Sequence, residues 1–301
     1  KASTLQWLGR DAQGEWKRHP IRFDEPSMHR LRWGDTRGRG RKQLVVAPLQ
    51  GKDTKGPNWG EGPGAKVLVY DVPEDPTKPD WPFEVADDSL HTIHNLWLTD
   101  IDADRQDEIL VAAWEGVFAL DRGDDGRWKK IKLGTGNQQA NPNKGASEIK
   151  LGRTVMGGPF LATIEPWHGT QVVVYTPPEL TPRQGLLKTG KLLDRKVLAE
   201  PLAWGHGVWC ADIDGEGDDE LIIGQRDPNP ANVSPRGPGV FVFDSHMGRN
   251  GLEWTRHTID DGGMACEDLV TADLDGDGRP EIIAGGRATH NVKIYWNKPP
   301  R

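Results

Sequence analysis

An acidic loop that recurs along the chain constrains the fold more than any other feature of the sequence. Copies of this loop begin at Asp35, Asp100, Asp212 and Asp273, and each is followed by a short run of Leu, Ile, Val and Ala. A second apolar run and then a weaker, more polar one come after it. Each repeat therefore predicts four short strands within roughly 60 residues, which is typical of one blade of a β-propeller.

A fifth copy lies between the second and the third and has lost its acidic loop. It consists of residues 148–153 followed by the apolar run 160–164. Five copies favour an all-β protein, a propeller of five four-stranded blades that occupies residues 1–301 as a single domain. The predicted blades are 24–93, 94–140, 141–203, 204–260 and 261–301.

The two ends of the chain bear on how such a ring closes. The last repeat has no fourth strand, whereas residues 15–21 carry a strand pattern that matches the fourth strand at 254–259. We therefore expect residues 1–23 to supply the closing strand of the last blade, which would leave no open sheet edge. A larger ring is the alternative if the chain is a trimmed piece of a longer protein.

Composition narrows the partners. The net charge is −7 and no block of Lys and Arg offers a phosphate-binding face, so nucleic acid is not expected as a partner. No apolar stretch is long enough to span a membrane, and no membrane association is expected. The 13 tryptophans are many for this length. Most are expected in the core, although Trp at the mouth of a site also stacks on sugar rings.

Three of the loops carry a full set of oxygen ligands for a hard cation, with three alternating acids and a later glutamate. The predicted ligands are Asp100, Asp102, Asp104 and Glu108, then Asp212, Asp214, Glu216 and Glu220, then Asp273, Asp275, Asp277 and Glu281. Acids this close repel one another unless a cation neutralises them, so we expect up to three Ca²⁺ ions that stabilise the hairpins. In the first loop Arg37 and Arg39 replace acids, and a fixed cation is expected where the ion would be.

A second set of side chains recurs six residues before each acidic loop. It comprises His29, His94, His206 and Glu267, and Glu148 takes the matching place in the eroded copy. Six strand residues span roughly 20 Å, about the thickness of a propeller. These five side chains are therefore expected to form a ring at the end of the channel opposite the acidic loops, and we predict that they are catalytic.

The loops that join the second and third strands of each repeat should lie on that same face. They carry His168, which we add to the catalytic group, and an outer wall suited to binding a substrate. The wall residues are Gln50, Trp114, Glu115, Trp167, Arg226, Asp227 and Arg287.

Two roles fit the predicted ring. Imidazoles and a carboxylate can hold a divalent transition metal that acts as a Lewis acid on a carbonyl. Alternatively, one His acts as a general base, with a second His or a Glu as the acid, in removing a proton next to a carbonyl. The sequence leaves both open. It contains no nucleophile elbow, phosphate-binding loop or Cys-x-x-Cys pair, which argues against the corresponding chemistries.

The loop pattern, with acids alternating before Glu-Ile-Ile as at 273–283, resembles FG-GAP and VCBS repeats. That resemblance implies calcium-binding blades. Because millimolar Ca²⁺ outside the cytosol fills sites of modest affinity, we expect a secreted or periplasmic location.

A narrower resemblance rests on residues 28–33, 164–175, 205–209 and 262–268. These segments are similar to the propeller domain of aldos-2-ulose dehydratases and their bacterial relatives. The resemblance implies a carbohydrate lyase that eliminates water from a keto-sugar such as 1,5-anhydrofructose at the His-lined face. The alternative is a non-catalytic calcium-stabilised propeller that binds a glycan or a protein.

Overall fold

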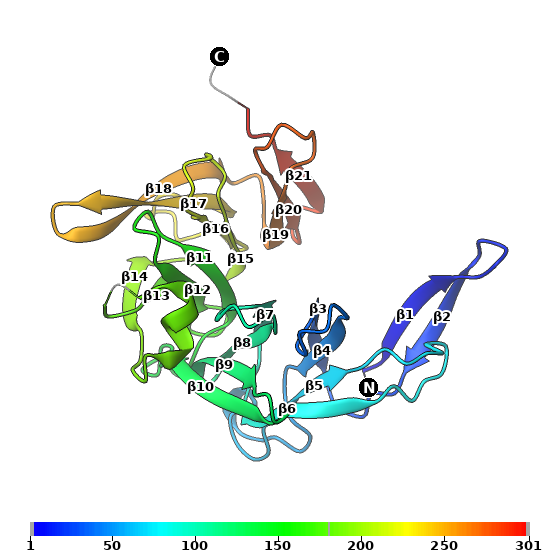
Figure 1. The fold of residues 1–301 in the computed structure, drawn as a ribbon. Helices are drawn as coiled ribbons and strands as arrows, with labels where there is room; N and C mark the ends of the chain where they lie inside the picture. Colours follow the sequence, from blue (N-terminus) through cyan, green and yellow to red (C-terminus); the bar gives the residue numbers. More distant parts are fainter. Residues whose placement is uncertain (1–2, 180, 299–301) are drawn as a thin grey trace.

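The computed structural model describes residues 3–179 and 181–298, and almost all of its regular structure is β-strand. Five antiparallel sheets follow one another along the chain and around an arc, so the chain is a five-bladed propeller (Figure 1). Two short 3₁₀ helices, η1 (Pro57–Trp59) and η2 (Arg183–Lys188), lie in the connections. No helix among the described residues is long and apolar enough to cross a membrane.

Four blades have four strands and the last has three. The first blade contains β3 (Met28–Gly34), β4 (Gln43–Pro48), β5 (Ala65–Tyr70) and β6 (Phe83–Leu90), and the second β7 (Asn95–Thr99), β8 (Glu108–Ala113), β9 (Gly116–Arg122) and β10 (Trp128–Gly134). The third contains β11 (Glu148–Arg153), β12 (Pro159–Glu165), β13 (Gln171–Thr176) and β14 (Asp194–Ala199). The fourth contains β15 (Gly205–Ala211), β16 (Glu220–Gln225), β17 (Gly239–Gly248) and β18 (Gly251–Asp261), and the fifth β19 (Cys266–Ala272), β20 (Glu281–Gly286) and β21 (Asn291–Tyr295).

A separate apolar cluster fills each interface between neighbouring blades. The second strand of a blade contributes to both of its interfaces, because alternate residues point to opposite faces of the sheet. In β8, for example, Ile109 and Val111 pack towards the first blade, and Leu110 and Ala112 towards the third. All four are fully buried, which explains why the second strands read as unbroken apolar runs.

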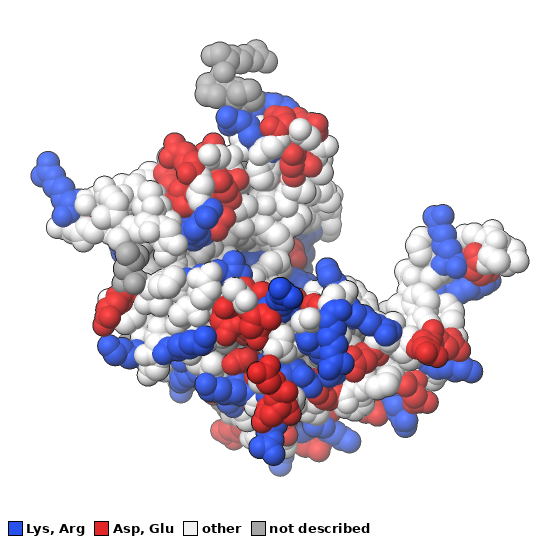
Figure 2. Space-filling model, viewed as in Figure 1, with Lys and Arg blue, Asp and Glu red and all other residues white. Residues whose placement is uncertain are grey.

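The first strand of each blade lies innermost, and these inner strands pack against one another in the order β3, β7, β11, β15 and β19. Their beginnings and ends therefore gather at the two ends of one central axis. The acidic loops follow the inner strands directly, so they all lie at the same end (Figure 1). Figure 2 shows acidic side chains gathered over the fourth and fifth blades, which carry two of these loops.

The prediction that the N-terminal strand completes the last blade is wrong. The strand forms as β2 (Trp16–Ile21), but it pairs with β1 (Leu5–Arg10) in a sheet of two strands. A tight turn at 11–15, in which the Asp11 carboxylate accepts the backbone N–H groups of Gln13 and Glu15, closes this hairpin locally. Leu5 and Ile21 then bury against the first blade rather than the fifth. In Figure 1 the hairpin accordingly projects from the first-blade end of the arc.

Candidate functional site

The ring predicted at the beginnings of the inner strands is present in the structure. His29, Glu148, His206 and Glu267 lie on the first or second residue of β3, β11, β15 and β19, and His94 directly precedes β7. Strand pairing explains how three of these side chains reach the axis. His29, His206 and Glu267 are each the extra residue of a β-bulge, where the register of the inner strand shifts by one residue. A bulge leaves its extra residue out of the ladder and re-aims the side chain.

His94 is the centre of a histidine cluster. Its ring centroid lies 4.8 Å from that of His29, 4.5 Å from that of His168 and 5.2 Å from that of His206. The side chain is almost fully buried, while His168 and His29 are partly exposed. Side chains from the first four blades therefore converge on one point.

His168 reaches the cluster from the loop between β12 and β13. Its backbone is in the left-handed region, with φ of 52°, an uncommon conformation for a histidine. The hairpin bonds on either side hold it there, including the bond from the N–H of Thr170 to the carbonyl of Glu165 at 3.0 Å. Strained backbone of this kind is concentrated at functional sites.

The hydrogen bonds of two histidines fix which ring nitrogen faces the centre. Nδ1 of His94 lies 3.0 Å from the Glu148 carboxylate and 3.2 Å from the carbonyl of Ser147, and Nδ1 of His206 lies 2.6 Å from the carbonyl of Glu267. Each Nδ1 must donate to these acceptors, so Nε2 of the neutral ring carries a free lone pair. Nε2 of His94 lies 2.7 Å from Nε2 of His168.

His94, His168 and His206 each offer one ring nitrogen, and these three atoms lie within 4.8 Å of one another. Burial lowers the pKa of His168 to about 3 and also lowers the pKa of His94, and the mutual repulsion of the imidazolium forms adds to both effects. Neutral imidazoles are the form that binds metals. The group therefore has the donor type and spacing of a transition-metal site, and two of its members, His94 and His168, are held in the neutral form.

Arg30, which the sequence reasoning missed, completes the support beneath His94. Its Nη2 lies 3.2 Å from the Glu148 carboxylate, and its Nε donates to the carbonyl of His94 at 3.1 Å. Although burial works to raise the pKa of Glu148, the hydrogen bond and charge of His94 together with Arg30 hold it well below its usual range. Glu148 is thus an anion that orients His94, as carboxylates do behind histidine ligands of metals.

An aromatic wall borders the histidines. The Trp167 ring lies 4.8 Å from that of His168, and the Trp59 ring lies 5.9 Å from that of Trp167. On the other side the Trp204 ring lies 4.9 Å from that of His168, and Trp204 is 41% exposed. Of these three only Trp167 was predicted. Trp59 ends the 3₁₀ helix η1, and Trp204 directly precedes β15; the repeat spacing identifies neither.

Charged side chains at the rim agree with part of the predicted wall. Arg226 lies over the Trp204 ring at 4.4 Å and pairs with Asp227 at 3.3 Å. It also lies 3.9 Å from Glu267, and the more exposed Arg287 lies 3.7 Å from the same carboxylate. Arg226, Asp227 and Arg287 therefore lie beside the ring of inner-strand side chains.

Two predicted wall residues are engaged elsewhere. The Glu115 carboxylate lies 2.6 Å from Nδ1 of His91 and accepts the backbone N–H of the same residue at 3.0 Å. Trp114 lines a separate pocket of about 220 Å³ with Pro57 and Lys144. Glu115 is thus bonded to His91, and Trp114 packs against Gly60, next to Trp59 of the aromatic wall.

Several polar atoms in this region are buried and have no hydrogen-bond partner. They are Nε2 of His29, Nε1 of Trp167, Oε1 of Gln50 and Oε2 of Glu267. Leaving one such atom unpaired costs about 1–3 kcal/mol, and native structures contain few of them. Those of His29, Trp167 and Glu267 belong to side chains that contact the cluster, where a polar ligand or water would satisfy them.

A buried cation lies below the ring. Lys150 follows Glu148 by two residues on β11, and its Nζ lies 4.5 Å from the Trp97 ring and 5.3 Å from the Trp209 ring. These two indoles meet edge to face at 5.2 Å. Together the three side chains form a cation–π layer across the inner strands of blades two, three and four, which we call the indole floor.

The indole floor gives a pH-dependent prediction. Burial lowers the pKa of Lys150 to about 8, against the opposing charges of Glu148 and Asp268, with Arg32 acting in the same direction as burial. Between pH 8 and 10.5 the unfolded chain binds more protons at this residue than the folded one does. Stability should therefore rise with pH in this window, by on the order of 3 kcal/mol relative to a Lys150→Met variant. Urea unfolding of both proteins at pH 8 and 10.5 measures this difference, and an equal pH dependence would contradict it.

The acidic loops lie at the other ends of the inner strands. In each of the three complete loops the first acid, the second acid and the final glutamate place one carboxylate oxygen each within 4.8 Å of the others. These groups are Asp100, Asp102 and Glu108, then Asp212, Asp214 and Glu220, then Asp273, Asp275 and Glu281. The remaining predicted ligands, Asp104, Glu216 and Asp277, lie outside these groups.

In two of these loops a buried glutamate lies close to several other carboxylates, so the carboxylates repel one another. Burial, together with the neighbouring aspartates, raises the pKa of Glu108 and of Glu220 to about 8. The fourth blade also places Asp218 and Asp244 within reach of Glu220, a second three-acid group that the sequence reasoning missed. A cation in place of the bound protons would remove this repulsion.

In the first loop an arginine side chain, rather than a bound cation, offsets the repulsion between carboxylates. Arg37 donates to both oxygens of Asp71, at 3.1 and 2.8 Å, and lies 3.5 Å from Glu84. The guanidinium therefore neutralises acids of the neighbouring strands in the loop that lacks the acidic set. Arg39 is exposed, and its backbone N–H donates to Asp35 at 3.1 Å.

The fold and the cluster together define a β-propeller with a histidine and carboxylate site at one end of its inner strands. Residues 2–178 match the family model of the aldos-2-ulose dehydratase β-propeller domain, so the chain belongs to this family. It is 29% identical over 289 residues to aldos-2-ulose dehydratase from Phanerodontia chrysosporium, which covers 91% of this chain and 30% of that protein. The chain thus spans less than a third of that relative.

Among solved structures, the chain is similar to an Agrocybe aegerita lectin described as recognising non-reducing terminal N-acetylglucosamine. The TM-score is 0.53 at 15% sequence identity, and the match covers 91% of this chain and 64% of the lectin chain. At this identity the likeness supports the propeller fold alone.

Proposed function

We propose that this protein is a carbohydrate dehydratase, which eliminates water from a keto-sugar such as 1,5-anhydrofructose at the histidine cluster. The observation that carries the proposal is the convergence of His29, His94, His168 and His206 with unpaired buried polar atoms around them. Membership of the dehydratase propeller family supports a role in sugar dehydration. A protein that only binds has no need for titratable groups that converge on one point.

His94, His168 and His206 would hold a divalent transition metal. The fit rests on their donor atoms, on the burial that lowers the pKa of His94 and His168, and on the Nδ1 hydrogen bonds that leave a lone pair on Nε2 of His94 and His206. When bound, such a metal supplies Lewis-acid polarisation of the substrate carbonyl. Glu148 and Arg30 hold His94 in the required orientation.

The remaining members of the ring are assigned to proton transfer and binding. Nε2 of His29 is buried, unpaired and beside His94. Burial and the charges of His94 and Arg30 lower the pKa of His29 to about 3, so the ring is neutral and can accept the proton next to the carbonyl. The electrons of that C–H bond form the new carbon–carbon double bond, and the β-hydroxyl departs. Protonated His29 then returns its proton to the departing hydroxyl, which leaves as water, and the residue is neutral again.

The rim suits a sugar. Trp204 and Trp167 present aromatic faces for the apolar side of a pyranose ring, and the Glu267 carboxylate has a free Oε2 that accepts a hydroxyl hydrogen bond. Arg226 and Arg287 lie beside this carboxylate, at 3.9 and 3.7 Å, and hold it in place. Gln50 adds a further unpaired acceptor.

We also propose that the three complete acidic loops bind structural Ca²⁺ and that the protein works outside the cytosol, where Ca²⁺ is abundant. The last loop supports this with Glu281, which is fully buried and has an unpaired Oε1. In the loop that begins at Asp100, Oδ1 of Asp102 is likewise buried and has no hydrogen-bond partner. Buried carboxylate oxygens without donors are ligands that a hard cation satisfies.

An absorbance assay tests the proposed activity. The protein, saturated with zinc, manganese or cobalt in separate samples, is incubated with 1,5-anhydrofructose, 3-keto-glycosides and uronides. We expect the ultraviolet absorbance of an enone to grow with at least one keto-sugar in proportion to protein concentration. No absorbance change with any of these substrates would contradict the dehydratase and leave glycan or protein binding as the function of this face.

A further inference from the structure

The third blade differs from the others at the end that carries the acidic loops. Between their inner and second strands, blades one, two, four and five have eight unpaired residues, for example 100–107 between Thr99 and Glu108. In the third blade Arg153 pairs with Pro159, so only the five residues 154–158 remain. Three residues are missing from the place where the other blades extend a loop.

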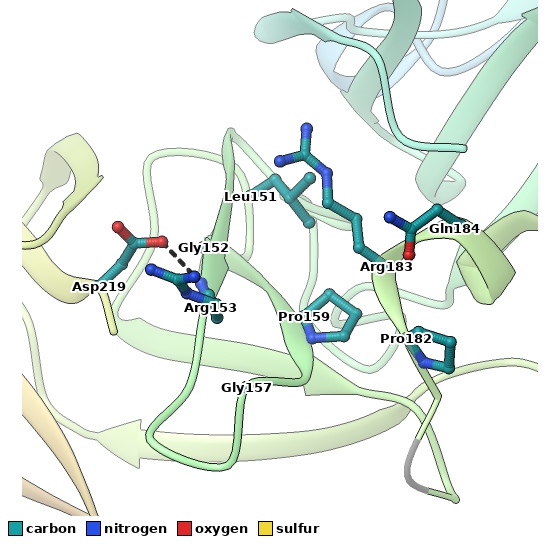
Figure 3. Close-up of a pocket in the computed structure, with 9 residues that line it drawn as sticks. All are labelled: Leu151, Gly152, Arg153, Gly157, Pro159, Pro182, Arg183, Gln184 and Asp219. Atoms are coloured by element: carbon teal, nitrogen blue, oxygen red, sulfur yellow. Dashed lines mark hydrogen bonds between the residues drawn. The ribbon is translucent and has the colours of Figure 1, made fainter. Parts of the chain in front are cut away.

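A pocket of about 500 Å³ lies at this shortened hairpin, and we call it the blade-three pocket (Figure 3). Arg153 and Asp219 form one wall, and Arg183 and Gln184, from the beginning of η2, form the other. β11 runs from Glu148 in the catalytic ring to Arg153, so the pocket lies roughly 17 Å from the ring. It is a separate site.

Arg183 brings a positive charge to the blade-three pocket. Its Nη2 donates to the hydroxyl of Thr99 and, at 2.8 Å, to the backbone carbonyl of Asp100. Both acceptors are neutral, so they hold the guanidinium in place without cancelling its charge. Within residues 3–179 and 181–298, neither Arg183 nor Arg153 forms an ion pair within 4 Å, although the charge of Arg153 acts on the neighbouring Asp219 carboxyl.

The other lining groups suit a polyhydroxylated ring. Pro159, Pro182 and Leu151 supply an apolar surface for C–H groups. Gln184 offers both a donor and an acceptor for hydroxyls. The Asp219 carboxylate uses Oδ2 to accept the backbone N–H of Arg153 at 2.8 Å, and its other oxygen remains an acceptor.

We infer that the blade-three pocket binds a small anionic sugar, a uronic acid or a sugar phosphate, with its acidic group between Arg153 and Arg183. Two guanidinium groups pair with a carboxylate or phosphate through charge-assisted hydrogen bonds. The volume accommodates one or two sugar rings. At the matching position the complete blades present clustered acids, which would repel the same ligand. The assignment does not depend on the proposed dehydratase activity.

Calorimetric titration at low salt tests this site with D-glucuronate, glucose 6-phosphate, D-glucose and inorganic phosphate as separate ligands. We expect saturable binding of at least one of the two anionic sugars, and at least tenfold weaker binding of glucose and of inorganic phosphate. The two anionic arms distinguish a carboxylate from a phosphate ligand. Affinity should fall as salt is raised, because the ion pairs are near the surface.

Arg153→Gln is the principal variant, since its side chain has no other partner among the described residues, and Arg183→Gln is the second. Each should weaken binding of the anionic sugar at least tenfold. Arg249→Gln, at the exposed tip between β17 and β18, is the matched control and should bind as the wild type does. Thermal unfolding of each variant checks the fold. Equal affinity for glucose, equal affinity for inorganic phosphate, or unchanged binding by Arg153→Gln would each overturn the proposal.

Discussion

Replacing His168 with asparagine is expected to lower the proposed dehydratase activity at least about 100-fold. It should also lower the amount of transition metal bound per protein molecule. His168 supplies one of three ring nitrogens that lie within 4.8 Å of one another, and two remaining imidazoles hold a metal much less tightly. Asparagine tolerates the left-handed backbone at this position, so the loop keeps its conformation. Metal analysis after dialysis and the absorbance assay measure the two effects.

His246→Asn provides the control for this experiment. His246 lies on β17 in the fourth blade, outside the histidine cluster, and pairs only loosely with Glu253 at 3.9 Å. Its replacement should leave metal content and activity at the wild-type level. If His168→Asn retains both at that level while folding normally, the assignment of the cluster is wrong.

Removal of calcium is expected to lower the thermal midpoint of unfolding by on the order of 10 °C. Each saturated site contributes about 2.7 kcal/mol when free Ca²⁺ is a hundred times its dissociation constant. Three such sites act on a protein of 301 residues, in which each kcal/mol shifts the midpoint by roughly 1.5 °C. Calorimetry with EGTA and with millimolar Ca²⁺ measures the difference, and identical midpoints would refute the calcium sites.

Glu281→Gln isolates one of these three sites. The side chain is fully buried, so the isosteric amide preserves the packing while removing one charge from the ligand set. We expect the stabilisation by Ca²⁺ to fall by about a third. Glu74→Gln, a change at an exposed position outside the loops, should leave the full calcium effect.

Most of the architecture follows from sequence because it repeats. The apolar runs predicted the second strands, and the count of six residues back from each loop found His29, His94, His206 and Glu267. That count works because the inner strands all have similar lengths, so a shared register places equivalent residues at one end of the axis. In the eroded copy the strand runs placed Glu148 at the matching position, and the structure has it 3.0 Å from His94.

The closing strand could not be predicted from its own pattern. The alternation in 15–21 marks a strand but does not name its partner, which here is set by the local turn at Asp11 and by burial of Leu5 and Ile21. A hairpin closed over a few residues has a smaller entropic cost of closure than a pairing across the whole chain. The Asp and Gly residues of the segment 11–15, which favour a tight turn, were the sequence signal for this local hairpin.

The spacing of the repeats also could not predict the directions in which the side chains of the site point. Arg30 follows His29 directly and by simple alternation should point away, yet the bulge at His29 lets both residues reach the cluster region. Trp114 and Glu115 lie in a turn whose conformation depends on His91 in the preceding connection. Contacts of this kind are set by tertiary structure and cannot be predicted from residue spacing.

The most direct test of the central claim follows 1,5-anhydrofructose by proton NMR in the presence of metal-replete protein. Catalysis at the histidine cluster predicts many turnovers in which the signal next to the carbonyl disappears and a single vinyl signal of the dehydrated product replaces it. His168→Asn should slow this conversion at least about 100-fold. A substrate spectrum that only broadens, with no vinyl signal after prolonged incubation, would contradict the account and show a face that binds without chemistry.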